Sequence, residues 1–282
     1  MEKIEWLWPG WFARGKFHLL AGGKGVGKST LAFDLFARMT TPGATWPDNT
    51  PIKAPADVMI WSGEDGVSDT ILPRFVAAGG NPDHIYFPVS TCVDGQSRSF
   101  DPSIDMEALV AAAEHYSNLG AVLIDPVVMV LPSRSDSHKN TETRRGLQPL
   151  VEFAEQRGVA ILGVTHFTKN TQDRDPVERV TGSLAFGALP RIIWGASKDD
   201  DEHQRRLVRI SSNIGPTGGG FEYTLFEAPI PDHDFSAQRV SWGKRLTGSA
   251  RELLDGQKRS AEGSAEAWLR EFLAISHNPR RT

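Results

Sequence analysis

A glycine-rich run near the amino terminus has the residue types and spacing of a phosphate-binding loop. It matches the pattern G-x-x-x-x-G-K-[ST] over Gly22, Gly23, Lys24, Gly25, Val26, Gly27, Lys28 and Ser29. A strand-like run precedes it and a helical pattern begins at Thr30, which is the context that the motif requires. Glycines let backbone N–H groups and the helix amino terminus face an anion. We therefore expect residues 22–30 to bind ATP, with the Lys28 ammonium on the β- and γ-phosphates and the Ser29 hydroxyl on Mg²⁺.

Carboxylates follow two other strand-like runs. Asp125 ends the apolar run 121–124, and Glu64 and Asp65 follow the run 58–62. The carboxyl ends of parallel strands line the ligand crevice of an α/β sheet. Asp125 is therefore predicted to hold a Mg²⁺-bound water, and Glu64 to deprotonate the water that attacks the γ-phosphate. A helix cap at Asp125, a cap or salt bridge at Glu64, and Asp65 as the base are the alternatives.

A histidine closes a further strand-like run. His166 follows residues 159–165 and precedes a segment without apolar periodicity, residues 168–181. A neutral imidazole at this position can contact the γ-phosphate and relay its presence into that segment. A structural hydrogen bond at the strand end is the alternative for His166.

Alternating strand-like and helical runs form the frame that must position these residues. Strand-like runs occupy residues 17–21, 58–62, 85–89, 121–124 and 159–164, and helical runs occupy residues 31–39, 70–78, 106–116 and 144–156. This alternation is typical of a largely parallel sheet covered by helices on both faces. Runs at 191–196, 207–211 and 221–226 predict antiparallel strands at one edge. The predicted fold class is therefore α/β.

The chain divides into a large predicted domain and a short tail. Residues 1–243 carry the alternating pattern, whereas residues 244–282 are polar, partly helical and hold eight basic against five acidic residues. Within the large domain, residues 132–143 and 168–181 form long loops, and loops of this length in a compact domain are usually functional or mobile.

Composition narrows the class of protein. The 31 Lys and Arg residues against 35 Asp and Glu give a net charge of −4, so any nucleic-acid contact requires a local basic patch. Cys92 is the only cysteine, which excludes an internal disulfide and favours a reducing cytoplasm. The most apolar stretch, residues 119–131, is interrupted by Asp125 and is shorter than the about 20 residues of a membrane-spanning helix. We expect a cytoplasmic protein without a membrane partner.

Several motifs in a fixed order carry a resemblance to a known family. They are Trp6-Leu7-Trp8-Pro9-Gly10, the glycine-rich loop, Ser62-Gly63-Glu64-Asp65, Ile124-Asp125-Pro126, Thr165-His166-Phe167-Thr168-Lys169, Thr181-Gly182-Ser183 with Arg191, and Ser212-Asn213-Ile214-Gly215-Pro216. Over residues 4–228 the chain resembles the RepA-type hexameric helicase ATPases, relatives of DnaB in the RecA-like superfamily. The resemblance implies a RecA-like P-loop fold and a homo-oligomeric ring, usually a hexamer. In such a ring ATP lies between neighbouring subunits and single-stranded DNA lies in the channel.

The resemblance also implies roles for single residues. The residue matched by Glu64 is the catalytic base, the Asp125 match serves Mg²⁺, and the His166 match senses the γ-phosphate. The residue matched by Arg191 reaches across the subunit interface as an arginine finger. Pairing of Arg191 with a local carboxylate at a strand start is the alternative. The two long loops correspond to the channel-facing DNA loops of the family.

The chain departs from the family pattern in places. Relatives often carry Lys or Arg just before the Asn-Ile-Gly-Pro turn, where this chain has Ser211 and Ser212. Lys198 and Arg209 are nearby substitutes for that cation. Lys24 occupies a position where relatives commonly have Pro, which should leave nucleotide binding intact. A recognisable amino-terminal partner-binding domain and a complete winged-helix tail are missing, so the resemblance implies ATPase activity more directly than helicase activity.

Candidate DNA contacts lie in the two long loops. They are Arg134, Lys139, Arg144 and Arg145 in the first loop, and Lys169 and Arg179 in the second. Residues 132–146 have a local charge of +2, which a ring would repeat into a basic annulus, whereas the second loop is neutral. Solvated loops of mixed charge are the alternative interpretation.

Two functions are consistent with these patterns. The first is an ATP-hydrolysing ring motor on single-stranded DNA, a replicative helicase or translocase of a plasmid, phage or integrated element, with other replication proteins as candidate partners. The alternative is a RecA-like regulatory ATPase that controls protein assembly without unwinding. A small-molecule kinase fits less well, because Glu64 suits water activation and no arginine-rich lid is evident.

Overall fold

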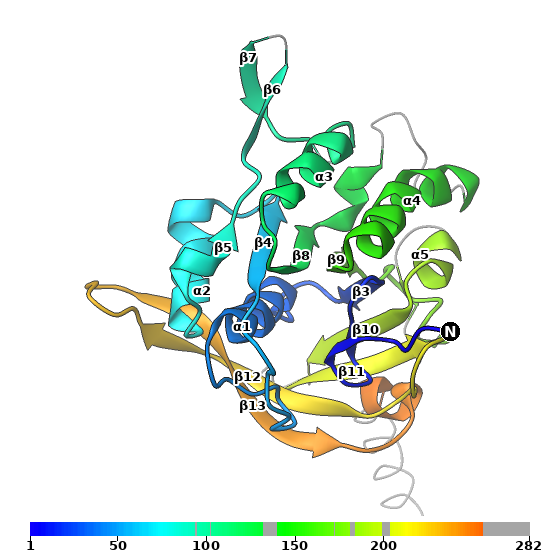
Figure 1. Ribbon diagram of the computed structural model, residues 1–282. Helices are drawn as coiled ribbons and strands as arrows, with labels where there is room; N and C mark the ends of the chain where they lie inside the picture. The colour runs from blue at the N-terminus through cyan, green and yellow to red at the C-terminus, as the bar shows by residue number, and fades with distance from the viewer. Residues whose placement is uncertain are drawn as a thin grey trace, which may run out of the picture.

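A computed structural model describes residues 1–93, 95–101, 103–131, 140–171, 173–180, 184–198 and 204–255 (Figure 1). Within these residues a nine-stranded sheet has the strand order β13-β12-β11-β10-β3-β9-β8-β4-β5. The strands from β10 to β5 in that order run parallel to their neighbours. These strands are β3 (Phe17–Gly22), β4 (Asp57–Ser62), β5 (Ile85–Tyr86), β8 (Leu119–Asp125), β9 (Ala160–His166) and β10 (Ile192–Lys198).

Three antiparallel strands extend the sheet beyond β10. They are β11 (Arg205–Ser212), β12 (Gly220–Pro229) and β13 (Ser236–Leu246). The nearly continuous burial of β3, β8 and β9 fits strands that are covered on both faces, whereas β13 has only Ala237 and Val240 buried, as fits a half-exposed edge strand.

Helices cover both faces of the sheet. Side chains of α1 and α2 pack with Leu20, Val58 and Leu123 in one apolar cluster. Side chains of α3, α4 and α5 pack with Leu19 and Val122 in a second cluster, and alternate strand residues point to opposite faces. The helical segments are α1 (Lys28–Thr40), η1 (Val67–Ile71), α2 (Leu72–Ala77), η2 (Pro82–His84), α3 (Met106–Glu114), η3 (Val127–Val130), α4 (Asn140–Arg157) and α5 (Leu184–Ala188).

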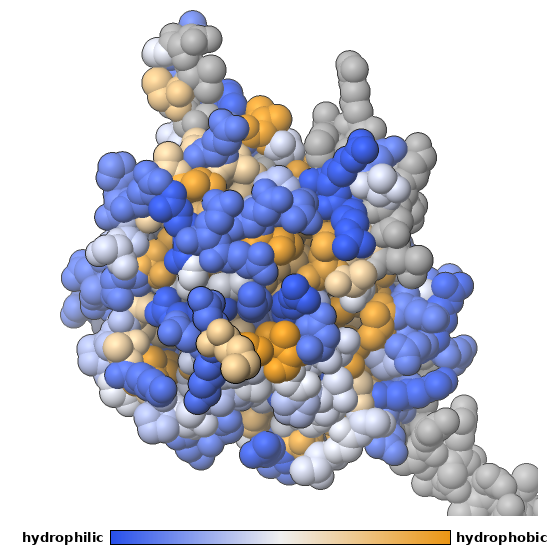
Figure 2. Space-filling view, turned by 45° about the vertical axis from the view of Figure 1, so that its right-hand side comes forward, coloured by the Kyte–Doolittle hydropathy of each residue, from blue (hydrophilic) through white to orange (hydrophobic). Residues whose placement is uncertain are grey.

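Two small hairpins complete the fold. Strands β1 (Trp6–Trp8) and β2 (Phe12–Ala13) pair near the amino terminus. Strands β6 (Ser90–Val93) and β7 (Gln96–Ser99) form a second hairpin, which projects from the body at the top of Figure 1. Figure 2 shows a face of the molecule on which apolar side chains are scattered among hydrophilic ones. In the described part of the chain, no helix has the length and apolar character needed to span a membrane.

The predicted α/β fold class, with a mainly parallel sheet and antiparallel edge strands, is confirmed. Several boundaries differ. Strand β5 ends at Tyr86 instead of residue 89, and α4 begins at Asn140, inside the predicted loop 132–143. The sequence analysis missed β13, because an edge strand with several exposed charged residues has little apolar signal. This strand continues to Leu246, past the predicted domain boundary at residue 243.

Candidate nucleotide-binding site

The glycine-rich loop connects the carboxyl end of β3 to the amino terminus of α1. Strand β3 ends at Gly22 and α1 begins at Lys28, as the motif predicts. A Cβ atom on Gly22 would lie 2.6 Å from the carbonyl oxygen of Ala196 in the neighbouring strand β10, so a side chain at this position would collide with the backbone. Lys24 is exposed at the tip of the loop, whereas Val26 and Thr30 are buried.

The Lys28 side chain is buried in the loop and points back toward its beginning. Its Nζ donates to the carbonyl oxygens of Gly22 (3.2 Å) and Gly23 (2.9 Å), and it lies 3.2 Å from Nδ1 of His166. Desolvation lowers the pKa of Lys28, while the carboxylates of Asp125 and Glu64 act in the opposite direction. The ammonium group therefore lies in the loop, within reach of bound phosphates.

Ser29 and Asp125 come together as a pair of oxygen groups. The Ser29 Oγ donates to Oδ2 of Asp125 at 2.6 Å. Burial raises the pKa of Asp125 to about 6, because its charge is poorly solvated at the end of β8. A hydroxyl and a carboxylate beside a phosphate loop fit Mg²⁺, which takes oxygen ligands and is usually held by one or two carboxylates together with substrate phosphates.

Glu64 and Asp65 lie in different surroundings although they are neighbours. The Ser62 Oγ accepts the backbone N–H of both residues, at 3.2 Å from Glu64 and 2.9 Å from Asp65. The Asp65 carboxylate pairs with Arg74 at 3.6 Å, whereas the Glu64 side chain is exposed. Glu64 follows the carboxyl end of β4, where Ser62 pairs in register with Asp125 and the Gly63 N–H donates to the Asp125 carbonyl at 2.9 Å, so Glu64 lies at the same edge of the sheet as Asp125.

His166 lies beside the start of the loop. Its register partner in β3 is Gly22, and the next residue, Phe167, donates its backbone N–H to the Gly22 carbonyl at 3.2 Å. Desolvation and the Lys28 ammonium lower the pKa of His166, which keeps the imidazole neutral at pH 7. Because an ammonium group can only donate, Nδ1 of His166 accepts from Lys28 and Nε2 carries the hydrogen.

Arg191 lies at the amino ends of the parallel strands, whereas this site lies at their carboxyl ends. Its backbone N–H donates to the carbonyl of Phe17, the first residue of β3, at 2.8 Å. Gly22 is five residues further along β3, which is about 16 Å of strand. Arg191 is therefore too far away to contact a nucleotide in its own P-loop.

Neither substitute for the missing cation near Ser211 is available at that position. Arg209 is buried, its guanidinium donates to the carbonyls of Gly10 (2.7 Å) and Gly218 (3.0 Å), and it stacks over Trp11 with 4.6 Å from Cζ to the ring centroid. Lys198 pairs in register with Arg205, at the other end of the β10–β11 hairpin. Within one chain, the contacts of Arg209 and the distance of Lys198 from Ser211 do not favour either residue as the replacement for that cation.

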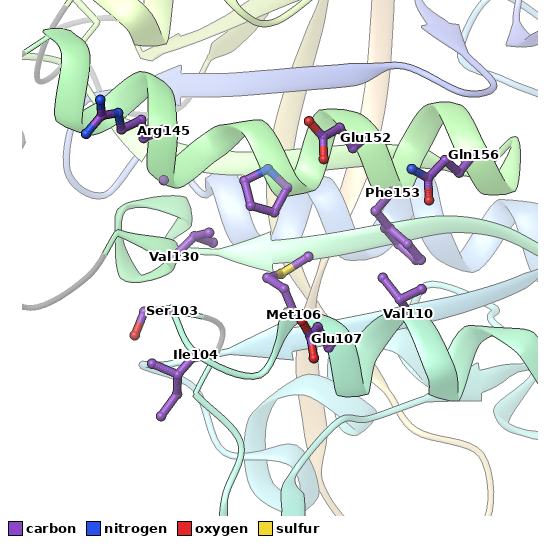
Figure 3. A pocket seen from close by; sticks show the side chains of 12 residues that line it. Ser103, Ile104, Met106, Glu107, Val110, Val130, Arg145, Glu152, Phe153 and Gln156 are labelled. Atoms are coloured by element: carbon purple, nitrogen blue, oxygen red, sulfur yellow. The ribbon is translucent and has the colours of Figure 1, made fainter.

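The candidate DNA contacts differ in whether the structure describes them and in how exposed they are. Arg134 and Lys139 lie outside the described residues, and Arg144, Arg145 and Lys169 are exposed. Helix α4 ends just before the amino end of β9, so it runs back across the sheet from the edge that holds the carboxyl ends of the strands. Its first residues, including Arg144 and Arg145, therefore lie toward the edge that carries the P-loop. Figure 3 shows Arg145 at a pocket of about 570 Å³ between α3 and α4, which is lined by apolar side chains such as Val110 and Phe153.

Arg179 is not presented to solvent. It is 5% exposed, and its guanidinium donates to both carboxylate oxygens of Asp255, at 2.7 and 2.8 Å. Its Nε also donates to the carbonyl of Arg174 at 3.0 Å. The prediction of Arg179 as a DNA contact conflicts with this arrangement, because the guanidinium is buried and paired with a carboxylate. The sequence does not indicate this pairing, since Asp255 lies 76 residues away.

Comparison with known proteins places the chain in a family. A family model described as an AAA domain, AAA_25, matches residues 1–172, more than half of the 282 residues. The chain belongs to the AAA_25 family. The matched part of this AAA_25 protein includes the glycine-rich loop, Glu64, Asp125 and His166.

Individual relatives agree with this placement. The DNA repair protein RadA of Brucella abortus (strain 2308) is 27% identical over 246 residues, which are 85% of this AAA_25 chain and 46% of RadA, so the chain spans about half the length of that relative. The crystal structure of the RadB recombinase matches with a TM-score of 0.52 and 16% identity, over 76% of this chain and 89% of that structure. The family is therefore AAA_25, and the fold is RecA-like.

Proposed function

We propose that this protein hydrolyses ATP with Mg²⁺ and uses the energy to act on single-stranded DNA. The observation that carries the proposal is the convergence of Lys28, the Ser29–Asp125 pair, Glu64 and His166 at one edge of the sheet. Each group is one that phosphoryl transfer to water requires: a cation, two metal-binding oxygens, a carboxylate base and a polar group beside the γ-phosphate.

The chain's own residues divide the work of hydrolysis. On nucleotide binding, Lys28 exchanges the carbonyls of Gly22 and Gly23 for phosphate oxygens. Ser29 and Asp125 would hold Mg²⁺, and the bound ion would neutralise charge on the β- and γ-phosphates. Glu64 orients the attacking water and takes its proton, because it is the exposed carboxylate while Asp65 is paired with Arg74. In this exchange His166 loses its contact with Lys28. Its imidazole is then able to contact the γ-phosphate and so act as a sensor of it.

The DNA part of the proposal has separate support. Arg144, Arg145 and Lys169 are exposed cations, and such side chains bind phosphate backbones without reading sequence. The curated relative RadA is named as a DNA repair protein. The resemblance to RepA-type hexameric helicases extends the proposal: the protein forms a ring that moves along single-stranded DNA, and replication proteins are its partners.

The ring gives Arg191 a role that it cannot have within one subunit. Its position, about 16 Å of strand from its own P-loop, supports the nucleotide of another subunit as its target, and pairing with a local carboxylate at the strand start is the alternative. Mixing Arg191→Ala protein with Lys28→Ala protein, each inactive alone, should restore part of the ATPase activity, because some interfaces then combine an intact P-loop with an intact Arg191. A monomer in the presence of ATP, Mg²⁺ and DNA would contradict the ring.

A regulatory ATPase without DNA is the second candidate. The observation that favours it is the pairing of Arg179 with Asp255, which removes one predicted cation from the second loop. In this function the nucleotide state controls assembly with protein partners.

DNA-stimulated hydrolysis distinguishes the two candidates. The ATPase rate should rise with single-stranded DNA at low salt. The double variant Arg144→Ala/Arg145→Ala should bind DNA more weakly, and its salt-dependence slope should fall by about 0.7 for each lost phosphate contact. Lys53→Ala is the control, because this exposed lysine precedes the amino end of β4, at the other edge of the sheet. A wild-type protein that binds no DNA, even with an ATP analogue present, would favour the regulatory ATPase.

A further inference from the structure

Strand β12 contacts the phosphate-binding loop from the antiparallel edge of the sheet. The Tyr223 hydroxyl donates to the carbonyl oxygen of Val26, inside the loop, at 2.8 Å. Tyr223 is fully buried, and burial raises its pKa, so the hydroxyl keeps its proton and remains a donor at neutral pH. The two residues are 197 positions apart in the sequence.

This hydrogen bond fixes the orientation of one peptide group. The Val26 carbonyl and the Gly27 N–H belong to the same trans peptide, in which C=O and N–H point to opposite sides. With the carbonyl directed at Tyr223, the Gly27 N–H points away from β12. Backbone N–H groups of such loops are the groups that bind phosphate oxygens.

A second side chain of β12 packs against the same peptide. Gly27 has φ of 83°, a left-handed conformation, and a Cβ atom at this position would lie 2.5 Å from Cδ1 of Leu225. Tyr223 and Leu225 are two residues apart and therefore point to the same face of the strand. Strand β13 adds a contact nearly two turns into α1, where the Trp242 indole N–H donates to Asp34 at 2.7 Å.

We propose that Tyr223 is a positioning residue for nucleotide binding: its hydroxyl, together with the Leu225 side chain, holds the Val26–Gly27 peptide in the orientation that presents the Gly27 N–H to phosphate. The inference rests on the proposed nucleotide-binding function. It assigns part of the phosphate site to residues that lie beyond the AAA_25 match, which ends at residue 172.

Replacing Tyr223 by Phe removes the hydroxyl and keeps the ring in its buried position. Tyr223→Phe should bind a non-hydrolysable ATP analogue with Mg²⁺ roughly two- to tenfold more weakly, the range for one lost hydrogen bond. The KM for ATP should rise by a similar factor while kcat stays within about twofold, because the loop holds phosphates equally in the ground and transition states. Tyr116→Phe is the control, because Tyr116 stacks on Tyr86 in another part of the fold.

A second variant keeps the test independent of the stability of Tyr223→Phe. Leu225 is half-buried, so Leu225→Ala should fold, and it leaves Gly27 without its packing partner. We expect the same rise in the dissociation constant of the analogue. Phe226→Ala is the matched control, since Phe226 is 44% exposed and points to the opposite face of β12.

The outcomes separate the inference from the function on which it rests. Wild-type protein that binds no ATP analogue would refute the nucleotide-binding proposal and the inference with it. Wild-type protein that binds, with both variants at the wild-type dissociation constant and KM, would refute the positioning role alone. A lower melting temperature without a change in binding would assign Tyr223 a purely structural role and overturn the inference.

Discussion

The P-loop and the loop that follows β9 begin side by side, at Gly22 and His166, but different contacts hold them. The P-loop combines local hydrogen bonds, from Lys28 to carbonyls five and six residues away, with one remote hydrogen bond from Tyr223 to Val26. In the second loop, over the described residues 168–171 and 173–180, the buried Arg179 pairs with Asp255, which is 76 residues distant. The local contacts of the P-loop belong to a motif that the sequence reveals, whereas the remote contacts of both loops leave no motif.

The largest expected effect concerns the base beside the P-loop. Glu64→Gln should still bind ATP but lose about 10²- to 10⁴-fold in kcat, because an amide keeps the shape and cannot accept the proton. Steady-state hydrolysis and binding of an ATP analogue measure the two effects separately. Asp65→Asn is the matched control, and if it lost activity while Glu64→Gln kept it, Asp65 would be the base.

The cation of the P-loop should have the next largest effect. Lys28→Ala should lower kcat/KM by about 10²- to 10³-fold, comparable to the loss of one preorganised group at a developing charge. Lys53→Ala should have little effect, because this exposed lysine precedes the amino end of β4, away from the loop. Equal ATPase rates for wild type and Lys28→Ala would refute the proposed nucleotide-binding site.

The ion pair between Arg179 of the second long loop and the distant Asp255 can be removed without changing any residue of the P-loop. Asp255→Asn should lower the free energy of unfolding by about 1–3 kcal/mol, because it leaves the buried Arg179 guanidinium without its ionic partner. Urea unfolding measures this, and limited proteolysis should show faster cleavage within residues 168–180. Glu178→Gln, an exposed residue of the same loop, is the control. Unchanged stability and cleavage would show that Asp255 does not support the loop.

The smallest effect concerns the other end of β3, where His18 is buried. Its Nε2 accepts the Ala13 N–H at 3.1 Å, Nδ1 lies 3.2 Å from the Ile161 carbonyl, and burial lowers its pKa to about 3. An unfolded chain with a His pKa near 6.5 binds the proton first, so this contribution to stability is complete above that pH and is lost as pH falls toward 3. We expect a loss of about 1 kcal/mol between pH 6 and pH 5.

Urea unfolding at a series of pH values measures the His18 contribution. His18→Gln should remove this part of the pH dependence, even if the variant is less stable overall. Identical slopes for wild type and variant between pH 6 and pH 5 would show that His18 is not the titrating group.

The sequence was a good guide to the position of a residue that follows or begins a strand or motif. Lys28, Asp125 and His166 each follow or begin a regular element, and parallel strands necessarily bring their carboxyl ends to one edge. It was a poor guide to Arg209 and Arg179, because both are charged residues whose burial depends on partners far along the chain. A charged residue in a polar segment is usually exposed, so the sequence pattern favours the wrong expectation.

The sequence by itself determined the α/β class and the glycine-rich loop, because periodicity and motif spacing act over a few neighbouring residues. It also predicted the candidate catalytic groups Glu64, Asp125 and His166. Only the tertiary structure decided that Asp65, and not Glu64, has an ion pair within the described part of the chain, that Arg191 lies at the far end of the sheet, and that Tyr223 contacts Val26. These relations depend on strand order and register, which bring together residues that no local pattern connects.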